Sequence, residues 1–116
     1  MKDKGNRDLI ERTTRFALPI IEPYSSVPKT TVAQVLGRQL LRSGASVGGQ
    51  YREANRAKST ADFMSKIEGA FQELDETSYL AASETPISSE MEAAKRETEE
   101  LIFIFVAVVK AAKRGR

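Results

Sequence analysis

Apolar residues recur at steps of three and four along most of this 116-residue chain, which is the spacing of an α-helix with one buried face. This spacing predicts four helices, over about residues 7–24, 31–57, 61–84 and 88–113. Capping residues stand where the last three would begin: Thr30 or Thr31, Ser59 or Thr60, and Ser88 or Ser89. The short segments between them favour an all-α fold, an antiparallel up-and-down four-helix bundle that forms a single domain over residues 1–116.

For two segments the sequence allows two different local structures. Pro19 and Pro23 lack a backbone donor, so the first helix either kinks and continues to Tyr24 or ends near Leu18 before an extended segment. We favour the kinked helix, because the apolar spacing continues through both prolines. Residues 101–109 are rich in β-branched and aromatic side chains, which is typical of a strand. Strong helix formers flank the run on both sides, and we therefore expect a helix.

The second predicted helix has an apolar face and a basic face. At 100° per residue, one stripe carries Ala33, Leu36, Leu40, Gly44, Val47, Tyr51 and Ala54. The opposite stripe carries Arg38, Arg42, Ala45, Gly49, Arg52 and Arg56. Gly44, Gly48 and Gly49 each cost about 1 kcal/mol relative to alanine within a helix. We interpret them as sites where another backbone approaches closely; the alternative is that they break the helix.

The last predicted helix has more apolar surface than one bundle core can bury. Phe103, Ile104 and Val106 point in different directions from the apolar stripe, and Leu80 lies off the stripe of the preceding helix. Exposed apolar surface of this kind commonly marks an interface, so we expect a homo-oligomer that buries these four residues. The alternative is a slightly irregular monomer in which this helix is central.

Composition excludes much of enzyme chemistry. The chain has no cysteine and no histidine, which removes disulfides, thiol nucleophiles, imidazole bases and the usual zinc ligands. The glycine-rich stretch at 43–49 lacks the lysine and hydroxyl that end a phosphate-binding loop. We therefore expect no catalytic residue, no metal and no cofactor, and hence no enzyme.

The sequence contains no segment that we expect to enter a membrane. The longest apolar run has nine residues, far short of the roughly 20 that a membrane-spanning helix needs. The first residues are polar and mixed in charge, unlike a signal peptide. We expect a cytoplasmic protein.

Charge is segregated along the chain, although the net charge is only +2. Residues 31–60 hold five basic side chains and one acid, whereas residues 61–90 hold one lysine and seven acids. A candidate nucleic-acid surface combines the helix arginines with the basic tail: Arg38, Arg42, Arg52, Arg56, Lys110, Lys113 and Arg114. The alternative is that the arginines pair with Glu73, Asp75 and Glu76 of the next helix.

Three stretches of the chain resemble a known family. Residues 12–18, 39–54 and 73–77 are similar to a bacterial four-helix-bundle family. Its members include proteins encoded in intervening sequences of large-subunit ribosomal RNA genes, and it is related to the accessory variability protein of diversity-generating retroelements. The family's recurring polar residues match Arg42, Ser43, Ser46, Tyr51, Glu53, Glu73 and Glu76.

The resemblance implies a non-enzymatic bundle that assembles into a ring, most simply a homopentamer. For the retroelement relatives it also implies a basic surface that binds nucleic acid and a reverse transcriptase. Together with the residue patterns, this favours a homo-oligomeric protein that binds RNA or DNA. The alternative is a scaffold or partner-binding ring without a nucleic-acid role, in which the arginines serve subunit contacts.

Overall fold

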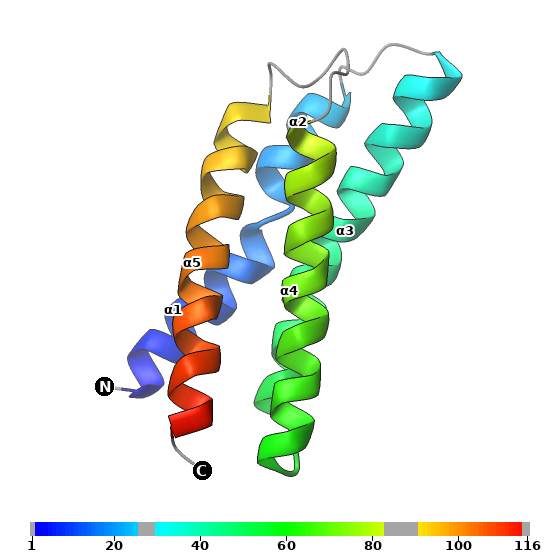
Figure 1. Cartoon of the computed structure of the whole chain (residues 1–116). Helices are drawn as coiled ribbons and strands as arrows, with labels where there is room; N and C mark the ends of the chain where they lie inside the picture. The colour runs from blue at the N-terminus through cyan, green and yellow to red at the C-terminus, as the bar shows by residue number, and fades with distance from the viewer. Residues whose placement is uncertain (1, 26–29, 83–90, 115–116) are drawn as a thin grey trace.

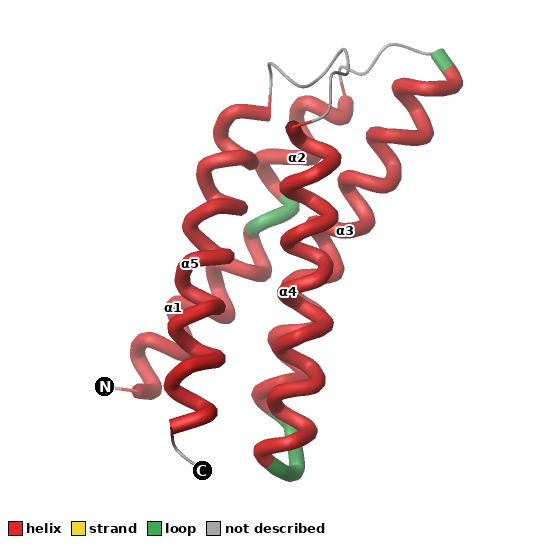
Figure 2. The backbone as a smooth tube through the Cα atoms, viewed as in Figure 1, coloured by secondary structure: helices red, strands yellow, loops and turns green. Residues whose placement is uncertain are grey.

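The computed structural model describes residues 2–25, 30–82 and 91–114, and within these ranges the chain is helical with no strand (Figure 1). The helices are α1 (Lys2–Arg15), α2 (Leu18–Ser25), α3 (Thr31–Asn55), α4 (Thr60–Ala82) and α5 (Glu92–Arg114). Figure 2 shows that non-helical backbone in the described ranges is confined to short connections. Helices α1 and α2 run up, α3 runs down, α4 up and α5 down, so the predicted up-and-down four-helix bundle is confirmed.

The segment predicted as one helix over residues 7–24 is divided into α1 and α2, and it begins earlier than predicted. Pro19 has no N–H, so it cannot donate to the carbonyl of Arg15 as an unbroken helix would require. The helix stops there and restarts, with the Ile21 N–H donating to the Ala17 carbonyl at 2.9 Å. Pro19 then lies in the first turn of α2, where a missing donor costs little. The extended alternative is wrong for this segment, because both prolines lie inside a helix.

Polar caps define the starts of α3 and α4. The Ala33 N–H donates to Thr30 Oγ1 at 3.2 Å, and the Asp62 N–H donates to Ser59 Oγ at 3.0 Å. Of the paired capping candidates, Thr30 and Ser59 are therefore the caps.

Residues 101–109 lie within α5, so the helical interpretation of that run is confirmed.

The predicted helices over 31–57, 61–84 and 88–113 correspond to α3, α4 and α5. α3 ends two residues sooner than predicted, at Asn55. The predicted end at residue 84 and the predicted start at residue 88, with its two candidate caps, lie outside the described residues.

Two clusters of buried side chains fill the bundle. The larger one is built from Leu9, Phe16, Val47, Tyr51, Ala54, Ile67, Ala70, Leu74, Leu101 and Phe105. The smaller one, near α2, is built from Ile20, Ala33, Leu40, Ala81, Met91 and Ala94. Burying a side chain the size of leucine or phenylalanine contributes roughly 1.5–3 kcal/mol, so these clusters supply most of the driving force for folding.

The helices pack unevenly around this core. α3 and α4 form the most extensive pair, α5 packs on α4, and α1 packs mainly on α3. α1 and α5 approach each other much less, so the seam between them is open over part of its length. This uneven packing creates the groove described below.

Candidate nucleic-acid interface

All four arginines of the predicted basic stripe are exposed: Arg38, Arg42 and Arg52 lie on α3, and Arg56 is its C-cap. Arg42 differs from the others because it is ion-paired. Its Nη2 donates to Glu76 Oε2 at 2.6 Å and its Nη1 donates to Glu73 Oε1 at 3.4 Å, both on α4. The hydrogen bond to Glu76 raises the pKa of Arg42 further above its usual value. The predicted pairing of arginines with helix-α4 acids is therefore correct for Arg42, whose charge is compensated within the subunit.

Arg52 and Arg56 keep their positive charge uncompensated. Arg52 Nη2 donates to Thr14 Oγ1 of α1 at 3.0 Å, and this acceptor is neutral. Glu53, the nearest acid along the chain, is engaged by Lys66 of α4 at 3.1 Å. Arg56 is exposed and forms no side-chain ion pair with the described residues. These two cations remain available to an anion from solution.

Charge is polarised along the bundle. We define the basic end as residues 5–9, 51–68 and 107–114, which hold eight cationic and four acidic side chains. The acidic end, residues 16–21, 30–42, 73–82 and 91–100, holds four cationic and seven acidic ones, of which Glu97 and Glu100 pair with Arg12 of α1. Figure 1 shows these two sets at opposite ends of the helices. Arg38 and Arg42 therefore lie at the acidic end, and only Arg52 and Arg56 lie at the basic end.

The predicted tail cations Lys110, Lys113 and Arg114 are exposed on the last turns of α5, at the same basic end. Lys110 and Lys113 line a shallow depression between α4 and α5. Arg52 instead lies on the side where α3 meets α1. The fold thus brings the tail and the α3 arginines to one end of the molecule, on two different flanks.

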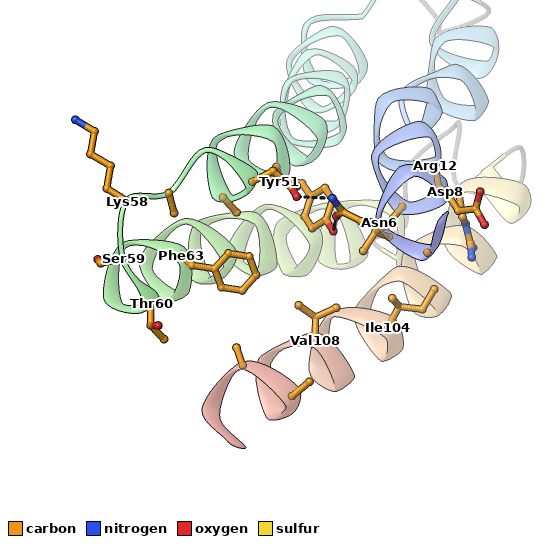
Figure 3. A pocket seen from close by; sticks show the side chains of 17 residues that line it. Asn6, Asp8, Arg12, Tyr51, Lys58, Ser59, Thr60, Phe63, Ile104 and Val108 are labelled. Carbon is orange, nitrogen blue, oxygen red and sulfur yellow. Dashed lines mark hydrogen bonds between the residues drawn. The ribbon is translucent and has the colours of Figure 1, made fainter. Parts of the chain in front are cut away.

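A groove of about 1040 Å³ opens at the basic end, between α1, the α3–α4 turn and the last turns of α5 (Figure 3). Its apolar lining includes Leu9, Phe63, Ile104 and Val108, and its polar lining includes Asn6, Lys58, Ser59 and Thr60. In Figure 3 the ring of Phe63 projects from α4 toward Val108 of α5. The helical periodicity of the sequence did not predict this groove.

One wall of the groove carries a hydrogen-bond network. Tyr51 Oη donates to Asn6 Oδ1, Asn6 Nδ2 donates to Asn55 Oδ1 at 2.7 Å, and Asn55 Nδ2 donates to the Tyr51 carbonyl at 2.9 Å. Burial raises the pKa of the Tyr51 phenol, which keeps it a neutral donor. The Tyr51 ring packs against Phe105 with a centroid distance of 5.6 Å. Sequence reasoning placed Tyr51 on the buried stripe but missed both asparagines, because Asn6 precedes the predicted helix start.

One of the polar residues that the resemblance singles out, Ser43, has a structural position. Ser43 and Thr77 are buried between α3 and α4, and their hydroxyl oxygens are 2.8 Å apart. One of the two hydroxyls donates to the other, and the hydroxyl that accepts donates to its own helix, to the Leu40 carbonyl from Ser43 or to the Glu73 carbonyl from Thr77. Ser43 therefore fixes the register of the two helices and is not available to a ligand.

The four residues predicted at an oligomer interface differ in exposure. Phe103 is 79% exposed and Val106 is 37% exposed on the outer side of α5. Ile104 is partly buried against the larger core cluster, and Leu80 is partly buried against the smaller one. The apolar surface that a second subunit could cover is therefore centred on Phe103 and Val106.

The described residues contain no group of three or more acidic side chains arranged to hold a metal ion. Within the same ranges, none of the helices combines the length and hydrophobicity that a membrane span requires.

Fold and surface together define a small all-α bundle whose charges are separated toward its two ends. Residues 6–105 match the family model described as 23S rRNA-intervening sequence protein, and the chain belongs to that family. It is similar to the crystal structure of a protein of unknown function from the S23 ribosomal protein family of Bacteroides thetaiotaomicron VPI-5482. The two share 27% identity with a TM-score of 0.76, over 90% of this chain and 97% of that chain. Comparison with curated proteins finds no match.

Proposed function

We propose that the protein is a non-enzymatic, homo-oligomeric protein that binds nucleic acid, RNA or DNA, through the basic end of its bundle. The observation that carries this proposal is the pair Arg52 and Arg56, exposed one helical turn apart and without an ion pair to a described carboxylate. Arginine donates to phosphate oxygens through two parallel hydrogen bonds, which suits it to a nucleic-acid backbone. The tail cations at the same end supply a second set of phosphate contacts.

The candidate residues at the acidic end have a smaller role in this proposal. A phosphate that approached Arg42 would compete with two carboxylates already bound to the guanidinium. Arg38 lies one turn from Arg42, at the same acidic end. We therefore assign the main contacts to Arg52 and Arg56, with Lys110, Lys113 and Arg114 in support.

The experiment that tests the proposal measures the affinity for a fluorescently labelled RNA by anisotropy, at salt concentrations from about 50 to 200 mM. We expect Arg52→Glu and Arg56→Glu each to weaken binding about tenfold and to reduce the salt dependence by about one phosphate contact. The matched control is Arg96→Glu, the same change in charge at an exposed position of the acidic end. It should alter the affinity about threefold at most.

Circular dichroism melting and light scattering of each variant show whether folding and assembly persist. If the unmodified protein binds neither RNA nor DNA in low salt, the proposal is wrong. It is also wrong if Arg96→Glu weakens binding as much as Arg52→Glu does, because the charge would then act without regard to position.

The exposed apolar surface around Phe103 and Val106 supports the self-association in this proposal. A five-subunit ring is the form implied by the resemblance, and light scattering in low and high salt measures the subunit number. The resemblance likewise implies a reverse transcriptase as protein partner, which co-purification with such an enzyme tests.

The pairing of Arg42 with Glu73 and Glu76 favours a second candidate, a partner-binding ring without a nucleic-acid role. In that case the remaining arginines serve contacts between subunits. Loss of assembly in Arg52→Glu and Arg56→Glu would support this candidate, whereas loss of RNA binding with assembly intact supports the first.

A further inference from the structure

The groove at the basic end exposes apolar and aromatic surface beside the cations that we assign to phosphate binding. Phe63 on one wall and Ile104 and Val108 on the other pack against the core only on their inner sides. The groove volume of about 1040 Å³ is at the upper end of the range for sites that hold drug-sized ligands. Its occupant should therefore present several flat or apolar groups.

The rim of the groove continues the candidate phosphate surface. Lys58 borders the groove at the α3–α4 turn, two residues after Arg56, the C-cap of α3, and its side chain extends outward from that turn (Figure 3). A ligand with anions along one side and rings along the other matches this arrangement, with charge at Arg56 and Lys58 and rings against Phe63. Single-stranded nucleic acid has this character, because its backbone is charged and its unpaired bases are free to stack on aromatic side chains.

The amides on the groove wall add a means of holding base edges. In the network with Tyr51, Asn6 Nδ2 uses one of its two hydrogens, and so does Asn55 Nδ2. Each amide therefore retains one N–H that can donate to a base placed in the groove. A duplex keeps its bases stacked inside, so any base that enters the groove has to come from a single strand.

We propose that this groove binds unpaired bases of a single-stranded RNA or DNA whose phosphates lie against Arg56 and Lys58. The inference rests on the proposed nucleic-acid function and names the substrate class. An acidic protein segment and a second copy of this chain are the other occupants of comparable chemistry, and the test below distinguishes them.

The experiment compares the affinity for a labelled single-stranded RNA with the affinity for a blunt duplex of the same length, in the full chain. We expect the single strand to bind about tenfold more tightly, since only it gains base stacking. Phe63→Leu keeps apolar packing but removes the aromatic face, and should weaken single-strand binding about fivefold without changing duplex binding. Tyr79→Leu is the matched control, because Tyr79 is aromatic and exposed on the same helix as Phe63 but does not line the groove.

A second variant blocks the groove without removing a contact to the core. Ala112→Phe adds a ring at a lining position of α5, while Ala93→Phe adds the same ring at an exposed position near the other end of that helix. We expect Ala112→Phe to abolish the preference for single strands and Ala93→Phe to preserve it. Melting temperatures of all four variants identify any that fail to fold.

Equal affinity for single strand and duplex would overturn the inference while leaving the nucleic-acid function intact. The absence of binding to either ligand would overturn both. If Ala112→Phe instead lowers the solution mass, or abolishes binding of an acidic helical peptide but not of RNA, the groove holds protein and the inference is wrong.

Discussion

Gly48 lies where α3 crosses α1, and its lack of a side chain permits the two backbones to approach. A Cβ at this position would lie 2.9 Å from the Thr13 carbonyl oxygen, which belongs to backbone that cannot move without shifting α1. At Gly44 a Cβ would meet the Cδ1 atom of Ile20, the end of a flexible side chain. Around Gly49 there is open space, with no neighbouring atom within 4 Å. The predicted approach of another backbone therefore holds for Gly48 alone, whereas a side chain approaches Gly44 and nothing approaches Gly49.

Alanine substitutions at Gly48 and Gly49 should have opposite effects. We expect Gly48→Ala to lower the free energy of unfolding by about 1–3 kcal/mol, because the new methyl group overpacks against α1. Gly49→Ala should raise it by up to about 1 kcal/mol, because alanine favours the helix and meets nothing. Urea unfolding of both variants measures the difference, and effects of the same sign would contradict the packing described here.

The buried phenol of Tyr51 makes stability depend on alkaline pH. Burial raises its pKa in the folded protein above that in the unfolded chain, so the folded state retains the proton longer. The contribution of this group is thus fully present below about pH 10, the ordinary tyrosine value, and is lost as the pH rises through the folded pKa.

Tyr51→Phe isolates this contribution. At pH 8 the variant should be less stable by about 1 kcal/mol, the value of the lost hydrogen bond to Asn6. Above pH 10 the difference from the unmodified protein should shrink, since the phenylalanine has no proton to lose. Urea unfolding at both pH values tests this, and a difference that grows in alkali would show that the phenol is not buried.

At the scale of elements, one arginine bridges the seam between α1 and α5. Arg12 Nη2 contacts Glu97 Oε1 at 2.8 Å and Glu100 Oε1 at 3.1 Å, and its Nε donates to Glu97 Oε2 at 3.0 Å. The hydrogen bond to Glu97 raises the pKa of Arg12, so the guanidinium keeps its charge in the bridge. Because α1 packs mainly on α3, this fork is the principal polar link across the seam in the described structure.

Arg12→Gln should therefore weaken the docking of α1. We expect a loss of about 0.5–1 kcal/mol at low salt that decreases as salt is added, because the pair is partly exposed. Lys95→Gln is the control, since Lys95 pairs only within its own helix, with Glu92 at 3.5 Å. Thermal melts at two salt concentrations measure the stability of both variants. If Lys95→Gln lowers the stability as much as Arg12→Gln does, the bridge does not hold α1 in place.

At the scale of the whole molecule, the outer side of α5 is the apolar surface left to a second subunit. Phe103→Glu should lower the mass measured by light scattering to that of a monomer or a smaller assembly, because a charge cannot be buried unpaired at an interface. Tyr79→Glu introduces the same charge at a residue that is 76% exposed on α4, and should leave the mass unchanged. An assembly that survives Phe103→Glu would place the interface elsewhere.

The sequence by itself determined the helix positions, the buried stripes and the caps, because each of these depends on residues within a turn of one another. Thr30 and Ser59 cap because their own helices follow them, and Leu40, Val47 and Tyr51 are buried because they share one face. The break before Pro19 was harder to place, because kinking and stopping have similar local costs.

Tertiary structure alone decided which arginine is free and where the groove opens. Arg42 and Arg52 lie on the same predicted basic stripe of one helix, yet α4 brings two carboxylates to the first and α1 brings a hydroxyl to the second. The charge of each segment is visible in the sequence, but its separation into two ends depends on the axial register of four helices. That register is set by long-range contacts such as Ser43 with Thr77 and Gly48 with Thr13, which no local pattern encodes.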